Sequence, residues 1–370
     1  MRLPSPKALL GRFQSTAGDA RDQAGDAQAR VARVDRLVAD GQVVDAIRLL
    51  TEMNRDERDP AIERRLVDLR FEAFDPTSAA SEPPPWPASV ADLFPGDLVP
   101  EIGRADLTAE TLRSGIANHG SLLVRGLIDD EQIDRLRGGI DRSLDAFDAQ
   151  EAGEVPPELE GWFEPAAQCP EADRQWKRKA GAVLAVDSPP ALFDLLEVFE
   201  DAGISQVARD HFGEAPTLLG LKTTLRKVSH VAWRHGDWHQ DGSFMGTAIR
   251  SLNVWIALTH CGDDAPGLDI VGRRLDYLAQ TGTDGALARW SVGAAVAERE
   301  GGDTIVRPVF EPGDALLFDH LMLHRTAIEP EMVRDRYAVE VWLFSPSTYG
   351  IMTSTEDQPN PPSDQRPFWL

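Results

Sequence analysis

The sequence predicts an α+β protein in which helices come first and an antiparallel β sandwich or barrel follows. Apolar residues recur at helical spacings up to about residue 74, prolines then interrupt the chain, and β-type segments without intervening helices dominate from Thr217 onward. A chain of 370 residues is long enough to enclose a large core, as one large domain or two smaller ones.

The N-terminal part is predicted to contain two or three short helices, interrupted at Asp40-Gly41 and Asp59-Pro60. We interpret residues 1–74 as a helical extension that packs on the main domain, and a partner-docking module is the alternative. Residues 75–95 are predicted to be a proline-rich linker, because proline removes a backbone donor and fixes φ.

The main domain is assigned to residues 96–350. It is expected to begin with a short apolar strand within His119–Ile128, an amphipathic helix from Asp129, and a further helix over 191–212. Five β-type segments follow, at residues 218–228, 251–261, 304–310, 313–324 and 336–344. Residues 351–370 are a proline-rich tail.

Composition excludes several classes of partner. The 61 acidic residues outnumber the 38 basic ones, and a formal charge of −23 opposes binding to nucleic acid or to anionic lipid. The two cysteines, Cys169 and Cys261, are far apart, so neither a disulfide framework nor a thiolate zinc site is indicated. The sequence shows no signal-peptide apolar region and no membrane-spanning run, and we expect a soluble, cytoplasmic protein.

The segment RHGDWHQDGS at residues 234–243 contains His-x-Asp twice, as His235/Asp237 and as His239/Asp241. Two side chains separated by one residue point the same way on an extended strand, so either pair could hold a metal ion. The composition alone yields on the order of half a chance match, so the motif is weak by itself.

A second segment strengthens the metal hypothesis. Residues 311–326 predict a turn and then an apolar strand that ends at His324, with His320 four residues earlier on the same side of an ideal strand. Two histidines and one carboxylate form the facial triad of non-haem Fe(II) oxygenases. Arg336, which opens the next predicted strand, could grip a carboxylate bidentately, and Arg334 is its competitor.

These motifs resemble those of a known family. Trp-His-Gln-Asp-Gly at 238–242, Gly-Asp-x4-Asp-x4-His at 313–324, Thr326 and Arg336 are similar to the motifs of the phytanoyl-CoA dioxygenase family of Fe(II)/2-oxoglutarate-dependent oxygenases. The similarity extends over roughly residues 115 to 346. It implies a double-stranded β-helix, or cupin-like jelly roll, with flanking helices.

The resemblance also implies the roles of particular residues. His239, Asp241 and His324 would be the iron ligands and the catalytic centre, and Arg336, Thr326 and Trp255 would bind 2-oxoglutarate. The family places an aromatic or hydrophobic residue just before the first ligand histidine, which favours His239/Asp241 over His235/Asp237. His324 is favoured over His320 because it ends the apolar run and is followed by Thr326, and Arg336 is favoured over Arg334 because it abuts the final strand. His235 is then expected beside the site.

One segment departs from the family. Many relatives carry a Pro-Gly-Ser-His-like turn where this chain has residues 265–275, so the resemblance does not extend to an acyl-CoA substrate. Four arginines suggest an anionic substrate, and ordinary surface ion pairs are the alternative: Arg234, Arg250, Arg273 and Arg274. Four residues near the motif are candidates to line a pocket or to pack in the core: Trp233, Trp238, Phe244 and Met245.

The resulting hypothesis is an enzyme that requires Fe(II), 2-oxoglutarate and O2 and hydroxylates an unactivated C–H bond of a small molecule, with release of succinate and CO2. Asp241 favours hydroxylation, because halogenating relatives lack this carboxylate. The alternatives are a degenerate jelly-roll binding protein without turnover and a mononuclear zinc hydrolase. Arg336 disfavours both alternatives, because neither a binding protein nor a zinc hydrolase needs an arginine that binds a cosubstrate. The primary substrate and the oligomeric state stay open.

Overall fold

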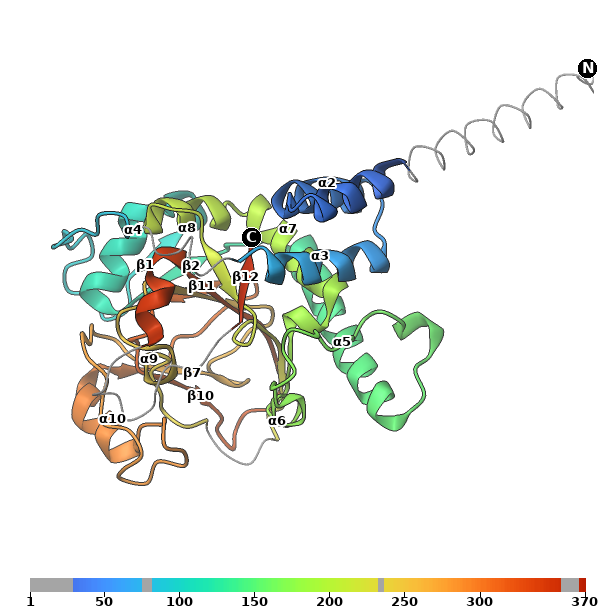
Figure 1. Ribbon diagram of the computed structural model, residues 1–370. Helices are drawn as coiled ribbons and strands as arrows, with labels where there is room; N and C mark the ends of the chain where they lie inside the picture. Colours follow the sequence, from blue (N-terminus) through green and yellow to red (C-terminus); the bar gives the residue numbers. More distant parts are fainter. Residues whose placement is uncertain (1–28, 75–81, 232–235, 354–365) are drawn as a thin grey trace, which may run out of the picture. The chain divides into compact units, whose positions relative to one another are not determined.

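The structure is a computed structural model that describes residues 29–74, 82–231, 236–353 and 366–370. The chain forms two compact units, residues 1–73 and residues 74–370 (Figure 1). The boundary lies where the helical pattern of the N-terminal residues ends, near residue 74.

The first unit is helical where it is described. Residues 29–39 are helical and are followed by α2 (Val43–Asp56) and α3 (Pro60–Glu72). The turns lie at Gly41 and Asp59, as predicted, and the Asp59 carboxylate caps α3 by accepting from the Ala61 amide at 2.7 Å. Apolar residues at helical spacings, such as Ile47 and Leu66, are buried between the helices.

The second unit is built around a large sheet, which has nine strands among the described residues. Its main path runs β1-β2-β9-β6-β11-β4-β12, with β5 also paired to β11 and β3 paired to β5. The strands are β1 (Glu101–Gly103), β2 (Ser121–Arg125), β3 (Ala182–Leu184), β4 (Thr217–Leu219), β5 (Thr224–Val228), β6 (Ser251–Ala257), β9 (Ala315–Phe318), β11 (Arg336–Phe344) and β12 (Pro367–Trp369).

A smaller antiparallel sheet has the order β10-β7-β8 and consists of β7 (Gly267–Val271), β8 (Ile305–Val306) and β10 (His324–Ala327). Alternate residues of the two sheets form one buried cluster that includes Trp255 of β6, Trp342 of β11 and Ile270 of β7. The two sheets therefore enclose a common interior, and the predicted jelly-roll fold with flanking helices is confirmed.

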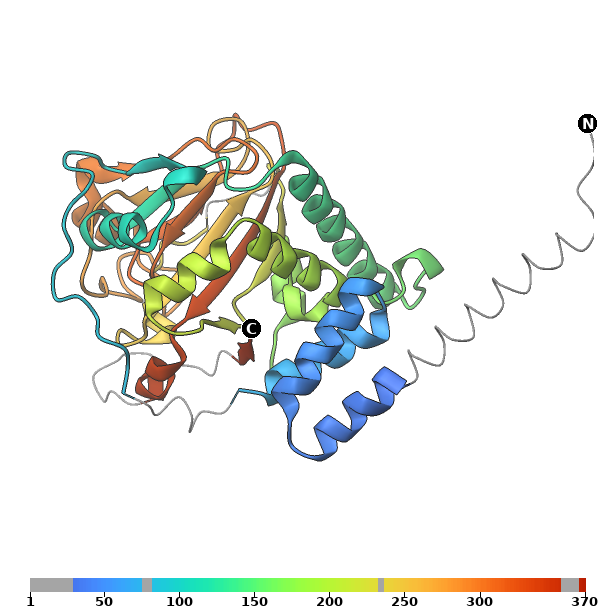
Figure 2. The ribbon, with the colours of Figure 1, turned by 90° about the horizontal axis from the view of Figure 1, so that it is seen from above.

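Helices cover the outer face of the large sheet, as Figure 2 shows. They are α4 (Ala109–Ser114), α5 (Asp130–Ala152), α7 (Pro189–Asp201) and α8 (Ile204–Phe212), whereas α6 (Arg174–Lys179) lies beside β3 and lines a cavity. Asp129 caps α5, as its position in the sequence predicts. The Asp141 carboxylate on α5 accepts from the Tyr337 hydroxyl at 2.7 Å, which ties the helix to the outer face of β11. The opposite face of β11 is thereby left to line the interior.

Several predicted elements are wrong in detail. The β-type segment expected over 218–228 is two strands, β4 and β5, with a turn between them. The helix expected over 191–212 is two helices, because Gly203 adopts φ 77 between α7 and α8. The strand expected to end at His324 stops at Phe318, and the chain then turns and crosses to the smaller sheet, where His324 opens β10. The Asp319 carboxylate stabilises this crossing by accepting from the Leu321 amide at 2.9 Å.

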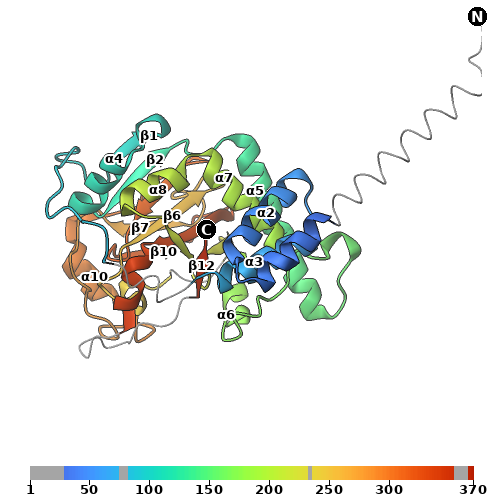
Figure 3. The same cartoon turned by 45° about the horizontal axis from the view of Figure 1, so that its top comes forward.

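Two short helices lie near the site. They are α9 (Gly242–Met245) and α10 (Ala294–Gly301). The segment 272–303, which contains α10, lies beside β7 and β10 at one end of the barrel (Figure 3). Along the part of the chain that the structure describes, no helix combines the length and the apolar character needed to cross a bilayer.

Gly181 offers a test of how α6 is joined to the barrel. It has φ 74, and an added Cβ would lie 2.3 Å from the carbonyl oxygen of Lys227 on β5. We expect Gly181→Ala to lower the free energy of unfolding by more than about 3 kcal/mol, because a left-handed backbone cost of about 1–2 kcal/mol adds to a backbone clash. Chemical denaturation measures the change.

Gly153→Ala is the matched control. Gly153 has φ 79, but nothing lies within 4 Å of an added Cβ. Its cost should be the left-handed backbone cost alone, about 1–2 kcal/mol. Equal losses of stability in the two variants would contradict the close docking of α6 on β5.

Candidate metal centre

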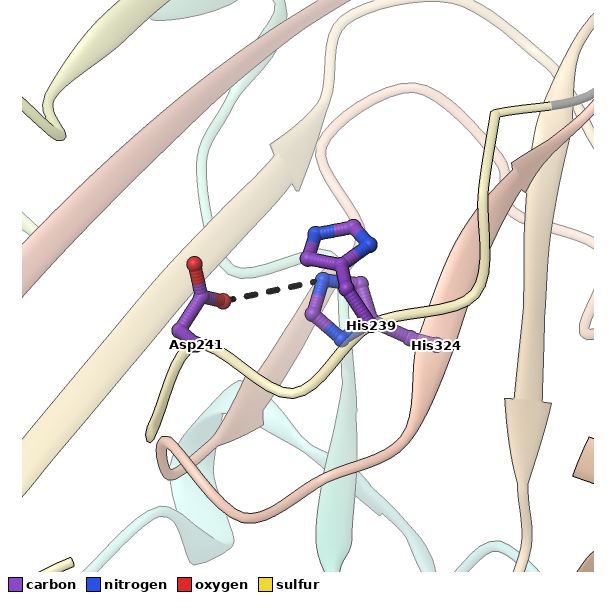
Figure 4. A group of neighbouring side chains, drawn as sticks. All are labelled: His239, Asp241 and His324. Carbon is purple, nitrogen blue, oxygen red and sulfur yellow. Dashed lines mark ion pairs between the residues drawn. The ribbon is translucent and has the colours of Figure 1, made fainter. Parts of the chain in front are cut away.

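His239, Asp241 and His324 come together in the barrel interior, as Figure 4 shows. Each offers one ligand atom, and these atoms all lie within 4.8 Å of one another. Reciprocal backbone hydrogen bonds join the two histidines: the His239 amide donates to the His324 carbonyl at 2.9 Å, and the His324 amide donates back at 3.0 Å. The loop after β5 is thus tied to the start of β10.

Both imidazole rings are held by backbone carbonyls. Nδ1 of His239 lies 2.9 Å from the carbonyl oxygen of Asp237, and Nδ1 of His324 lies 3.0 Å from that of Met322. A proton on Nδ1 would satisfy each of these hydrogen bonds and would leave Nε2 free as a ligand. Nε2 of His324 lies 3.8 Å from Oδ2 of Asp241 (Figure 4).

The electrostatics suit a metal site. Burial is the main cause that lowers the pKa of His239, to about 4, and the nearby His324 ring contributes in the same direction. The His239 imidazole is therefore neutral at pH 7. Burial would raise the pKa of Asp241, but Lys222 and the two histidines lower it, and the carboxylate stays ionised. Neutral imidazoles and an ionised carboxylate are the forms that bind metal.

The donor set fits a catalytic divalent metal ion. Both carboxylate oxygens of Asp241 are buried without an aligned hydrogen-bond partner, although Nζ of Lys222 lies 2.8 Å from Oδ1. Lys222 contacts Oδ1 of the buried Asp241 carboxylate, so a metal cation bound at Oδ2 would compensate the rest of its negative charge. Three protein ligands leave coordination positions open for other molecules, as in the non-haem iron facial triad.

The competing residues are placed elsewhere. His320 binds through Nδ1 to the Ser251 hydroxyl at 2.9 Å and lies outside the group of three. The Asp237 carboxylate accepts from the Leu287 amide at 2.7 Å and also from the Ser291 hydroxyl. His235 lies outside the described residues. Of the two His-x-Asp pairs, the structure brings His239/Asp241 to His324.

Arg336 is fully buried at the start of β11. Its Nη1 donates to the Gly267 carbonyl at 2.9 Å, and its guanidinium lies 5.3 Å from the Trp255 ring centroid. Its Nε and Nη2 are buried without a hydrogen-bond partner. Burial and the nearby Arg226 lower the pKa of Arg336 to about 10, so it remains charged and suits a carboxylate.

The other residues implied by the resemblance lie along the same interior. Thr326 is two residues beyond His324 on β10 and therefore shares its face of the strand. Trp255 pairs with Glu340 across β6 and β11, and its indole nitrogen is buried without a partner. Arg334 is exposed and paired with Asp264, so it is separated from this interior.

The sequence did not single out the residues that surround the triad. The Trp290 ring packs edge-to-face on His239 at 5.7 Å and on Phe244 at 5.9 Å, and its loop carries no recognisable motif. Lys222 reaches Asp241, and Arg226 pairs with Glu340 at 3.1 Å inside the barrel. Charged residues within segments that must be buried are the signal that would have identified Lys222, Arg226 and Glu340.

The arginines suggested for an anionic substrate are engaged in other contacts. Arg250 donates to the Pro84 carbonyl at 2.6 Å, Arg273 donates to the Glu300 carbonyl at 2.9 Å, and Arg274 pairs with Asp319 at 2.6 Å. Ion pairs with Asp or Glu, which were the alternative, are present for Arg273 and Arg274, whereas Arg250 binds a backbone carbonyl. Arg234 lies outside the described residues.

The four residues predicted to line a pocket or to pack in the core have different locations. Trp238 and Met245 belong to buried core clusters rather than to a pocket wall. Phe244 is partly buried and contacts Trp290, and Trp233 lies outside the described residues.

A jelly roll that encloses two histidines, one carboxylate and a buried arginine has the architecture of mononuclear non-haem iron enzymes. The family profile described as "Phytanoyl-CoA dioxygenase (PhyH)" matches residues 116–327, more than half of the chain. The chain belongs to this family, as predicted. Fe(II), 2-oxoglutarate and O2 are the cofactors and cosubstrates that go with it.

No curated protein matches the sequence. Among solved structures, AviO1 from Streptomyces viridochromogenes has 15% identity and a TM-score of 0.41, over 69% of this chain and 99% of that one. EvdO2 from Micromonospora carbonacea var. aurantiaca, complexed with 2-oxoglutarate, has 14% identity and a TM-score of 0.44, over 63% and 89%. The epimerase SnoN from nogalamycin biosynthesis has 13% identity and a TM-score of 0.41, over 71% and 95%.

The placement of the histidines predicts how metal binding responds to mutation. His324→Gln should weaken Fe(II) binding at least about 100-fold, because loss of a residue that only orients a ligand costs about 10–100-fold and this change would remove a ligand itself. His320→Gln is the matched control and should bind iron as the unmodified protein does, since its ring contacts Ser251 instead. Anaerobic calorimetric titration distinguishes the two, and a larger loss in His320→Gln would contradict the assignment.

Proposed function

We propose that this protein is an Fe(II)- and 2-oxoglutarate-dependent oxygenase that hydroxylates a C–H bond of a small molecule. The observation that carries the proposal is Arg336, a buried cation with two unused donors, enclosed in the same barrel interior as His239, Asp241 and His324. A dicarboxylate anchored at the metal by one end would present its other carboxylate to such a group.

In this proposal the two histidines and Asp241 would hold the iron. When bound, Fe(II) supplies the redox chemistry that couples O2 to decarboxylation of 2-oxoglutarate and to oxidation of the substrate, with release of succinate and CO2. Arg336 binds the far carboxylate of 2-oxoglutarate, Thr326 provides a hydroxyl beside it, and Trp255 packs against the guanidinium.

Other residues keep the centre in its working form. The carbonyl oxygens of Asp237 and Met322 fix the two imidazole rings. Lys222 helps to keep Asp241 ionised, and its ammonium lies 4.0 Å from the Phe244 ring centroid. The buried aromatic core around Trp255, Trp342 and Phe318 limits access of water, which protects a reactive centre from side reactions.

The two alternative functions are less well supported. A zinc hydrolase would use the triad to activate water and would need no buried cation for a cosubstrate. A binding protein without turnover would have no need for oriented imidazoles together with unused arginine donors. The burial of Arg336 at 0% exposure, without a carboxylate partner for its Nε and Nη2, therefore favours the oxygenase.

Formation of succinate from 2-oxoglutarate in the presence of Fe(II) and O2 tests the proposal. Arg336→Met should raise the KM for 2-oxoglutarate at least about tenfold, because a charge-assisted hydrogen bond contributes about 1.5–3 kcal/mol. Arg334→Met is the matched control, two residues away and 57% exposed, and should leave the KM unchanged. An unchanged KM in Arg336→Met, or a protein that forms no succinate with iron but hydrolyses esters with zinc, would contradict the proposal.

A further inference from the structure

The barrel interior contains more cations than the metal centre requires. Lys222, in the turn before β5, pairs with Asp241 at 2.8 Å. Arg226 of β5 pairs through Nη1 with Glu340 at 3.1 Å. Arg336 is the group that the proposed function assigns to 2-oxoglutarate. These three cations therefore have a carboxylate, either in the protein or in the cosubstrate.

Two donors are left over. Nε of Arg226 is buried and has no hydrogen-bond partner. Lys177 of α6 is partly buried, and none of the carboxylates in the described part of the chain forms an ion pair with it. It is close enough to Arg226 and Glu340 for their charges to affect it, and burial together with Lys222 lowers the pKa of Lys177 to about 8. The ammonium therefore stays largely protonated at pH 7.

Arg226 lines a cavity of about 620 Å³, a size typical of small-molecule sites, and Nζ of Lys177 lies 5.6 Å from the ring centroid of Trp176, which also lines the cavity. Arg226 and residues of α6, including Trp176, line the cavity. Trp290 also lines it and packs on His239, so the cavity opens next to the proposed iron. Its remaining wall includes apolar side chains such as Leu287 and Ile328.

Three other cations line the cavity, and one of them, Lys179, is exposed to solvent, which screens its charge. Arg178 binds Asp148 at 2.8 Å, and Lys227 binds Asp141 at 3.0 Å. They contribute less to an incoming anion than Arg226 and Lys177 do, because their charge is compensated and they lie nearer to solvent.

The balance of charge in the interior favours an anion. Lys177, Lys222, Arg226 and Arg336 are cationic, whereas Asp237, Asp241 and Glu340 are anionic. A bound Fe(II) and a dianionic 2-oxoglutarate cancel each other, so a positive excess remains. This excess stands out in a chain whose formal charge is −23.

We propose that the substrate is an amphipathic small molecule whose anionic group, a carboxylate or a phosphate, is bound by Arg226 and Lys177. Its apolar body then lies against Trp290 and Leu287, with the reacting carbon turned toward the iron. The assignment rests on the proposed function, since it takes Arg336 to be occupied by 2-oxoglutarate. Arg226 presents a planar fork and Lys177 a single ammonium, a combination that suits either anion.

The test uses protein loaded anaerobically with Fe(II) and 2-oxoglutarate and three probes of similar shape: 3-phenylpropionate, phenyl phosphate and the neutral 3-phenylpropan-1-ol. Titration followed by ligand NMR gives the three dissociation constants. We expect at least one anion to bind about tenfold more tightly than the alcohol. The anion that binds more tightly identifies the carboxylate or the phosphate as the group recognised.

Two variants locate the site. Lys177→Met should weaken anion binding about tenfold and leave binding of the alcohol unchanged. Arg226→Lys keeps a charge beside Glu340 but loses the fork, and should act in the same direction. Arg299→Gln removes an arginine that is 56% exposed on α10 and should change nothing. Because Lys177 is only partly buried, its variant keeps the inference testable even if Arg226→Lys does not fold.

Three results would overturn the inference while leaving the proposed function intact. They are equal binding of the alcohol and both anions, unchanged anion binding in Lys177→Met, and weaker 2-oxoglutarate binding in that variant in place of weaker anion binding. Failure of the unmodified protein to bind Fe(II) and 2-oxoglutarate together would instead overturn the proposed function. The absorption of the iron-bound cosubstrate, recorded before each titration, separates these cases.

Discussion

The backbone pairing of His239 with His324 is the constraint on which the site depends. It joins a loop that leaves the large sheet to the first residue of the small sheet, so the two histidines approach only if the barrel has closed. Carbonyl oxygens two residues earlier, in Asp237 and Met322, then set the direction of each ring. Backbone hydrogen bonds position the two histidine ligands, so the site is as rigid as the surrounding backbone.

Buried charge is the second organising feature. Asp241, Glu340 and Arg336 are withdrawn from water, which is costly unless each meets an opposite charge or a ligand. Lys222 forms an ion pair with Asp241, and Arg226 forms one with Glu340. Arg336 has no such partner, and its unused donors are the clearest indication that the interior is built to bind an anion.

The sequence predicted the class of fold, the family and the three residues that meet at the site. It could do so because the motifs around His239 and His324 are local and resemble those of a known family. Strand geometry did not supply the pair, since Asp241 has a helical backbone conformation at the start of α9. The prediction failed over residues 319–323, because an apolar run looks the same whether it continues a strand or crosses between two sheets. Trp290 packs on His239, and α6 lines the cavity beside it, through tertiary packing of a loop and a helix that no local pattern encodes.

The most direct test of the central claim is an anaerobic visible absorption titration of the unmodified protein with Fe(II) and then 2-oxoglutarate. Chelation of 2-oxoglutarate by Fe(II) held at His239, Asp241 and His324 predicts a metal-to-ligand charge-transfer band that requires both additions and saturates at one iron per chain. A protein that binds iron at this stoichiometry but develops no band with 2-oxoglutarate would contradict the account.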